Sequence, residues 1–217
     1  MKGLLIKDLS LIKMQGRFLV IVAFLGVFMA LNADNPTFVI GFMSYMGAIF
    51  TMNTISYDEF ENGNAFLFAL PITRKMYAME KYVFGIIFGG IMSAFSTVLC
   101  VIFELCSGFG NFVSIAEAAL WTIPMLLVML AVVIPIQLKF GGEKGRIVTI
   151  AAIGVAVGLG IAVVKLVNSE NFDLNGLYRI VSFLESNFIL PAAFLISCAL
   201  LFISYRISVH IVEKKEF

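Results

Sequence analysis

The sequence holds few residues that could act as nucleophiles, bases or metal ligands. Its single histidine, His210, follows the last long apolar run, and its three cysteines, Cys100, Cys106 and Cys198, form no CxxC pair. Chemistry on a substrate requires a nucleophile beside a base, or a group of metal ligands. No HExxH or GxSxG pattern and no pair of aspartates lies within an apolar run. We therefore predict that the chain is not an enzyme by itself.

One glycine-rich stretch, Gly141-Gly142-Glu143-Lys144-Gly145, invites comparison with a phosphate-binding loop. A Walker loop has the form GxxxxGK[ST] between a buried strand and a helix, so that backbone amides can surround the phosphates. Here Lys144 precedes a glycine instead of serine or threonine, and the stretch joins two apolar runs. We interpret it as a tight turn and predict no cofactor site in this chain.

Charged residues are almost absent from the interior of the long apolar runs. Glu104, Glu117 and Lys165 lie at the ends of runs, where long side chains can reach the membrane interface. An ion-coupled transporter needs an ionisable group at membrane depth to carry the coupling ion. The lack of an intramembrane carboxylate therefore argues against a secondary transporter.

The elements that must position these residues are membrane helices. Hydrophobic residues make up 61% of the chain and charged residues 13%, and the mean hydropathy is +1.02. A hydrocarbon core of about 30 Å needs roughly 20 apolar residues per helix, and strand-like alternation is lacking. The runs predict an all-α membrane protein, a single transmembrane domain over 1–217 with six transmembrane helices. They are residues 18–31, 38–55, 83–103, 118–138, 147–164 and 188–207.

Lysine and arginine are distributed unevenly between the two sides of this bundle. With the amino terminus inside, thirteen of the 15 basic residues lie in cytoplasmic segments, and only Lys165 and Arg179 lie outside. Cytoplasmic segments of membrane proteins carry an excess of basic residues. Both termini are therefore predicted to be cytoplasmic, with residues 32–37, 106–117 and 165–187 outside.

Two segments outside the spans also show helical patterns. Residues 1–15 have an apolar face and lysines off that face, which predicts an interfacial elbow helix before an uncleaved first span. Its apolar positions are Leu5, Leu9 and Ile12, and its lysines are Lys7 and Lys13. Residues 168–187 repeat apolar side chains at helical spacing and predict a short helix on the outer interface.

Small and amide residues in the runs indicate helix packing. Gly85-x-x-x-Gly89 and Gly154-x-x-x-Gly158 have the spacing that lets membrane helices approach closely. Asn53 and Gln137, near cytoplasmic ends of spans, are predicted to form hydrogen bonds between helices.

The cytoplasmic segment 56–82 is long for such an economical chain. It begins with acidic residues, passes through an apolar stretch and stops at Pro71, which are start and stop signals for a short helix. This helix, over about 58–70, fits two interpretations equally by spacing. It is either a docking surface for a partner or an interfacial helix that dips into lipid.

Parts of this segment resemble the cytoplasmic loop of ABC type-2 transporter permeases. The similar residues are Tyr57-Asp58-Glu59, Gly63, Phe66-Leu67, Leu70-Pro71-Ile72-Thr73-Arg74 and Glu80-Lys81-Tyr82. The opening Met1–Leu9 resembles the elbow helix of these permeases, and Leu138–Arg146 resembles their turn between the fourth and fifth spans. The layout is most similar to small bacterial permeases of peptide-toxin and bacteriocin-immunity exporters, including those for phenol-soluble modulins.

The resemblance implies a six-span half-permease in the bacterial cytoplasmic membrane. It would dimerise with a second copy or a paralogue and bind two ABC ATPase subunits, which would carry ATP and Mg²⁺. The cargo would be an amphipathic or hydrophobic peptide. The spans would also contact membrane lipid, and nucleic acid would not be a partner. The ATPase-docking residues of the coupling helix would be Asp58, Glu59, Glu61, Asn64, Phe66, Leu67, Leu70 and Arg74. Those of the second cytoplasmic loop would be Gly141, Gly142, Glu143, Lys144 and Arg146.

Two other classes of protein remain open from the residues alone. A self-contained channel or secondary transporter would be favoured by intramembrane charge or an inverted repeat. A non-transporting membrane anchor subunit would also lack chemistry of its own. A neighbouring gene for a lone ATPase domain would distinguish the permease from both.

Overall fold

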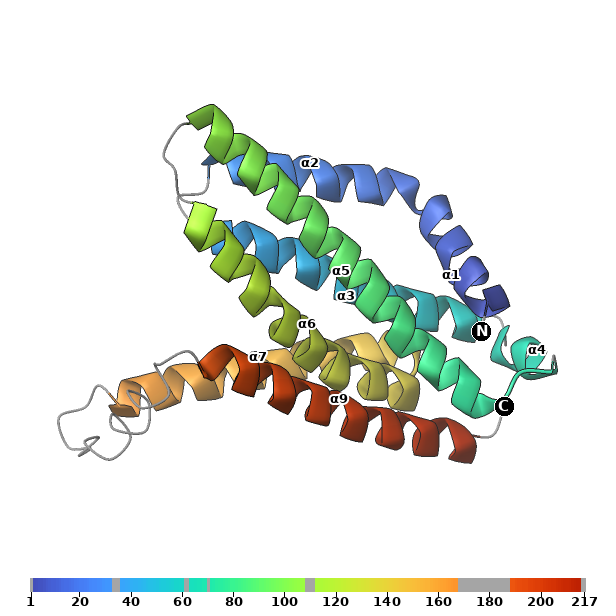
Figure 1. The fold of residues 1–217 in the computed structure, drawn as a ribbon. Helices are drawn as coiled ribbons and strands as arrows, with labels where there is room; N and C mark the ends of the chain where they lie inside the picture. The colour runs from blue at the N-terminus through green and yellow to red at the C-terminus, as the bar shows by residue number, and fades with distance from the viewer. Residues whose placement is uncertain are drawn as a thin grey trace.

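A computed structural model describes residues 2–32, 36–60, 63–69, 71–107, 112–167 and 188–215, and all secondary-structure elements in these ranges are helices (Figure 1). The all-α prediction is thereby confirmed for the described residues. The helices are α1 (Lys2–Met14), α2 (Gly16–Asn32), α3 (Pro36–Glu59), α4 (Gly63–Ala69), α5 (Arg74–Ser107), α6 (Phe112–Phe140), α7 (Gly142–Val167) and α9 (Ile189–Lys214). The helix predicted over 168–187 lies outside the described residues.

Five of these helices are long and apolar enough to cross a membrane, namely α3, α5, α6, α7 and α9. The first predicted span corresponds to α2, which has 17 residues and at 1.5 Å per residue reaches only about 26 Å. α1 and α2 together give a sixth candidate, bent by 71° at Gln15. The described residues therefore contain five or six spans, and α1 occupies the position of the predicted elbow helix.

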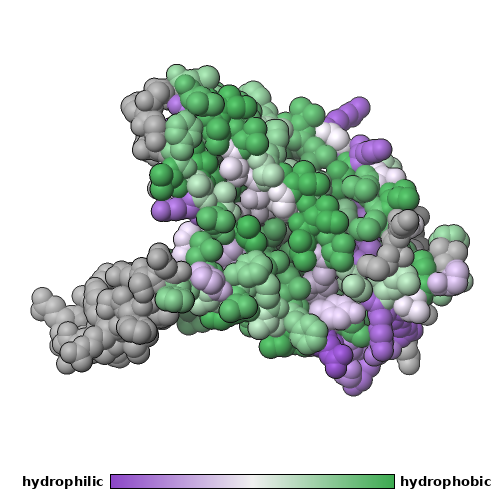
Figure 2. Space-filling model, viewed as in Figure 1, coloured by the Kyte–Doolittle hydropathy of each residue, from purple (hydrophilic) through white to green (hydrophobic). Residues whose placement is uncertain are grey.

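Both chain ends and α4 lie at the same end of the bundle (Figure 1). We call this end, which also holds the turn at Gly141, the polar end. Hydrophilic surface gathers there, whereas the sides of the helices are largely hydrophobic (Figure 2). α3 is the central helix, because it packs against α1, α2, α4, α5, α6 and α7.

Glycines allow the central helices to approach one another. A Cβ atom added to Gly47 of α3 would lie 2.7 Å from the Cα of Gly89 in α5. A Cβ added to Gly85 would lie 2.7 Å from a methyl carbon of Leu130 in α6. The close approach predicted for the Gly85 and Gly89 pair is confirmed. In contrast, a Cβ at Gly154 or Gly158 of α7 would meet nothing within 4 Å, so that pair serves no packing among the described residues.

Both ends of the predicted cytoplasmic loop 56–82 belong to the neighbouring helices. α3 continues to Glu59 and α5 begins at Arg74, so α4 is a seven-residue helix rather than one reaching from 58 to 70. Hydropathy underestimates the lengths of α3 and α5. The last turn of α3 and the first turns of α5 carry charged side chains that are buried against other helices.

The buried stripe of α1 also differs from the predicted one. Leu4, Asp8 and Ile12 are buried, whereas Leu9 is 47% exposed. The bundle therefore receives a carboxylate in the middle of the α1 face, which an apolar pattern cannot reveal.

Candidate functional site at the polar end

Two large aromatic side chains, Phe60 and Phe66, are exposed among the described residues of the predicted docking helix. Phe66 of α4 is 74% exposed, whereas the adjacent Leu67 is only 7% exposed. The predicted apolar face of this helix is thus divided between an outward and an inward residue. Glu61 and Leu70 lie outside the described residues, as does the side chain of Asn64.

The inward side of α4 is anchored in the bundle. Leu67 belongs to a hydrophobic cluster that includes Ile55 of α3 and Leu138 of α6. The ring of Phe68 packs edge-on against Tyr77 of α5, with 5.6 Å between the ring centroids. A movement of α4 would therefore be transmitted to α3, α5 and α6.

Arg74, predicted as a docking residue, joins α5 to the end of α9. Its guanidinium donates to the carbonyl oxygens of Val212, at 3.2 Å, and of Glu213, at 2.5 Å. It also lies 5.9 Å above the ring of Phe68. The last carbonyl groups of a helix lack partners within it and favour a cation, so Arg74 caps α9 and ties it to α4.

Glu59 joins two segments that were predicted as separate cytoplasmic docking loops. Its Oε2 accepts a hydrogen bond from the Gly142 backbone N–H at 2.6 Å, and its Oε1 accepts one from Lys215 Nζ at 2.7 Å. Gly141 has a φ of +82°, which favours glycine. A Cβ at this position would lie 2.6 Å from Glu59 Oε2. The turn is therefore shaped to bring the start of α7 onto the carboxylate.

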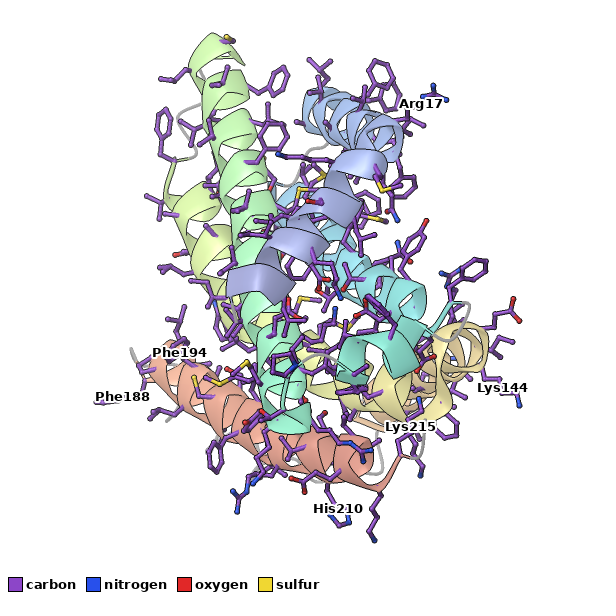
Figure 3. All side chains as sticks on the ribbon, turned by 90° about the vertical axis from the view of Figure 1, so that its right-hand side faces the viewer. Arg17, Lys144, Phe188, Phe194, His210 and Lys215 are labelled. Atoms are coloured by element: carbon purple, nitrogen blue, oxygen red, sulfur yellow. The ribbon has the colours of Figure 1, made fainter. Side chains whose placement is uncertain are left out.

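Amide side chains strengthen the same junction. Gln137 Nε2 donates to Ser56 Oγ at 2.9 Å and to the Gly142 carbonyl at 3.1 Å. Arg146 donates to Asn53 Oδ1 at 3.2 Å. The predicted hydrogen bonds of Asn53 and Gln137 between helices are thus confirmed. Glu143 and Lys144 are exposed, and Figure 3 shows Lys144 pointing away from the bundle.

The structure also contains a buried ion cluster that was not predicted, and it includes Asp58, which was predicted as a docking residue but is buried. Lys81 of α5 is fully buried, and its Nζ lies 2.5 Å from Asp8 Oδ2 and 2.8 Å from Asp58 Oδ2. The Asp58 carboxylate also pairs with Lys7 and accepts a hydrogen bond from the Tyr77 hydroxyl at 3.0 Å. We call these residues, together with Glu80, the Lys81 cluster. It joins α1, α3 and α5.

The electrostatics of this cluster favour the ionised form of Asp8. Burial by itself raises the pKa of the Asp8 carboxyl, but the ammonium groups of Lys81 and Lys7 outweigh it and hold that pKa below its usual value. Glu80 is fully buried, 3.5 Å from Lys81 Nζ. Asp58 lies in the last turn of α3, and Glu80 and Lys81 lie in the first turns of α5. Neither of these carboxylates is at the middle of a candidate span, so the cluster does not restore the case for ion coupling.

Two sequence signals could have pointed to the Lys81 cluster. The first signal is Asp8, which interrupts the apolar positions of α1. The second is Glu80-Lys81, which follows Arg74 so closely that it belongs to a helix and not to a loop if α5 begins at Arg74. Neither signal predicts which residues pair with one another. Asp8 and Lys81 are 73 positions apart in sequence and meet only because α1 packs beside α5.

Comparison with known proteins gives one match. The family model described as "ABC-2 family transporter protein" matches residues 3–213, almost the whole chain. No curated protein and no solved structure gives a significant match.

Proposed function

Because the chain belongs to the ABC-2 family of transporter proteins, we propose that it is the permease subunit of an ATP-driven exporter. In this proposal two separate ATPase subunits bind ATP and Mg²⁺, and this chain hydrolyses nothing. The excess of basic residues at the polar end supports placing that end in the cytoplasm. A second permease, either another copy or a paralogue, would complete the membrane part.

The observation that carries this proposal is the position of Phe66. It projects from α4, whose other side is anchored in the bundle by Leu67 and Phe68. A few large aromatic anchors carry most of the energy of a protein–protein contact. An exposed aromatic on an otherwise anchored helix is therefore suited to receive a partner and to pass on its movement.

The contacts at the polar end suggest how ATPase closure would reach the spans. Displacement of α4 would act on α5 through Phe68 and Tyr77, and on α9 through Arg74. Glu59 would couple the end of α3 to the start of α7. Rigid helices joined in this way can rotate as a body when the partner moves.

The proposal is tested by co-purification of the ATPase subunit with a Phe66→Ala variant. Loss of such an anchor is expected to weaken docking more than tenfold, or about 2 kcal/mol. Phe202→Ala is the matched control, because Phe202 is also a strongly exposed phenylalanine, at 63%, but belongs to α9 and is far from α4 in sequence. Glu61→Arg provides a second docking variant.

A lipid-dipping role for α4 predicts a different result. Both docking variants would then loosen membrane contact but retain the ATPase and transport. If both variants fully retain the ATPase and transport, the docking site lies elsewhere. Residues 141–146 are then the next candidate.

We propose amphipathic peptides as the cargo class. Support comes from the resemblance to peptide-toxin exporters and from helices that are rich in Met and Phe, of which the chain has 11 and 22. Deleting the gene should sensitise cells to amphipathic peptides or trap a secreted one inside. If deletion alters only lipid, sugar or metal handling, the cargo class is wrong, but the permease assignment stands.

A further inference from the structure

A hollow of about 530 Å³ with polar and aromatic lining lies at the polar end, between the starts of α2 and α7 and the last turns of α3. We call it the arginine hollow, because Arg17 and Arg146 line it from opposite helices. Asn53 and three aromatic residues, Phe18, Tyr57 and Phe60, also line it. Figure 3 shows Arg17 at the outer edge of α2, well apart from the ends of α9. The volume is in the range of small-ligand sites.

The charge in this hollow is not balanced by described residues. Arg146 donates to the neutral Asn53 amide at 3.2 Å, and no described carboxylate forms an ion pair with Arg17 or Arg146. Both arginines are exposed. Guanidinium groups bind phosphate through paired, charge-assisted hydrogen bonds. The hollow therefore offers two guanidinium groups to an anion that enters it.

The position of the hollow along the helices indicates where that phosphate comes from. Arg17 directly precedes the apolar run that starts at Phe18, and Arg146 directly precedes the run that starts at Ile147. The run of α3 ends at Ile55, beside the lining residue Ser56. All three helices thus leave the hydrocarbon region at the hollow. This is the depth of phospholipid headgroups, where aromatic side chains are also enriched.

Apolar side chains continue from the arginines toward the membrane. One helical turn beyond Arg17 lies Ile21, which is 55% exposed, and one turn beyond Arg146 lies Ile150, which is 66% exposed. An acyl chain attached to a bound headgroup would find these surfaces in line with it. A soluble phosphate compound would gain nothing from them.

We propose that the arginine hollow binds the phosphate of an anionic phospholipid. Basic pockets between membrane helices at the interface are suited to such headgroups. The bound lipid would connect α2 with α7, which both pack against α3. Its occupancy would therefore influence the relative position of the first and fifth spans.

The test is native mass spectrometry of the full chain extracted from nanodiscs of equal parts phosphatidylglycerol and phosphatidylcholine. The unmodified chain should retain phosphatidylglycerol in preference to phosphatidylcholine. Arg17→Gln and Arg146→Gln should each weaken retention about tenfold, the loss of one charge-assisted contact. Arg206→Gln is the matched control, because Arg206 is also exposed at the end of an apolar run, on α9, but does not line the hollow.

Three results would overturn the proposal. The first is equal retention of phosphatidylglycerol by all variants that elute as folded protein. The second is displacement of the lipid by glycerol phosphate at similar concentration, since the acyl chains would then contribute nothing. The third is loss of the ATPase subunit, but not of lipid, from the Arg17 and Arg146 variants, which would make the hollow a protein-docking surface. The lipid preference of the unmodified chain tests the proposal even if a variant fails to fold.

Discussion

Lys81 is the residue on which the buried polar contacts of three helices converge. Its ammonium group contacts Asp8 from α1 and Asp58 from α3, and it also donates to Thr54 at 3.3 Å. A buried charge is tolerated only when it is paired and hydrogen-bonded, and removal of one partner leaves the others uncompensated. This cluster therefore fixes how α1 sits against α3 and α5.

We expect Lys81→Met to destabilise the protein by about 3–5 kcal/mol, because Asp8 and Asp58 would lose their shared buried cation. Thermal unfolding of the purified chain in detergent measures the effect. Lys75→Met is the matched control, because the Lys75 side chain is 69% exposed and its ion pair with Glu213 is long, at 3.7 Å. Equal melting temperatures for the two variants would contradict this role, and Asp8→Asn should partly rescue Lys81→Met.

Gly141 is a second residue whose identity is set by its surroundings. Gly141→Ala should cost roughly 1–2 kcal/mol, because its φ of +82° is unfavourable for residues with a Cβ. The added carbon would also crowd Glu59 Oε2. Thermal unfolding tests this, with Gly154→Ala as control. Gly154 is helical with open space around its Cβ position, so its replacement should leave stability unchanged or slightly raised.

At the scale of elements, α3 organises the bundle. It is the most buried of the spans, and its last turns contact the ion cluster, the α6–α7 turn and the arginine hollow. Large side chains such as Phe50, which packs against the rings of Phe18 and Phe88, fill part of its contacts with α2 and α5. Small residues let the backbones of α3 and α5 approach closely at Gly47 and Gly89. Such packing depends on very short distances between backbones.

We predict opposite outcomes for two adjacent glycines of α5. Gly89→Ile should destabilise the bundle by roughly 1–3 kcal/mol, because its side chain would enter the contact with Gly47 and Leu126. Gly90→Ile should be tolerated, since a Cβ there meets nothing within 4 Å. Yield of monodisperse protein and its melting temperature provide the measurements. If both variants behave alike, the close approach of α3, α5 and α6 is not as described.

At the scale of the whole molecule, the distribution of charge and the arrangement of the helices both distinguish one end of the bundle. The termini, α4 and the Gly141 turn lie there together (Figure 1), and hydrophilic residues gather there on the face shown in Figure 2. Charge placement predicts that this end faces the cytoplasm. A partner that docks at this end would lie beside the helices that the Lys81 cluster and Glu59 join to one another.

Cysteine labelling in intact cells tests this orientation. On a background without Cys100, Cys106 and Cys198, an Asp34→Cys variant should react with a membrane-impermeant thiol reagent. A Lys144→Cys variant should react only after the membrane is opened, because thirteen of the 15 basic residues would otherwise lie outside. The reverse pattern of labelling would invert the topology.

Much of the architecture could be predicted from the sequence, because transfer of a helix into a membrane depends on local hydrophobicity. The apolar runs predicted the helical class and the five helices that are long and apolar enough to cross a membrane, although the charged ends of these helices extended beyond the predicted limits. The short helix before Pro71 and the packing of Gly85 and Gly89 were also readable as local patterns.

The site was decided by the tertiary structure. Lys81, Asp8 and Asp58 are far apart in sequence, and nothing local distinguishes a buried ion pair from two solvated charges. The junction of Glu59 with Gly142 likewise depends on α3 and α7 ending side by side. Ion pairs and hydrogen bonds act over a few ångströms between specific atoms, so the packing of the helices had to be known before these partners could be identified.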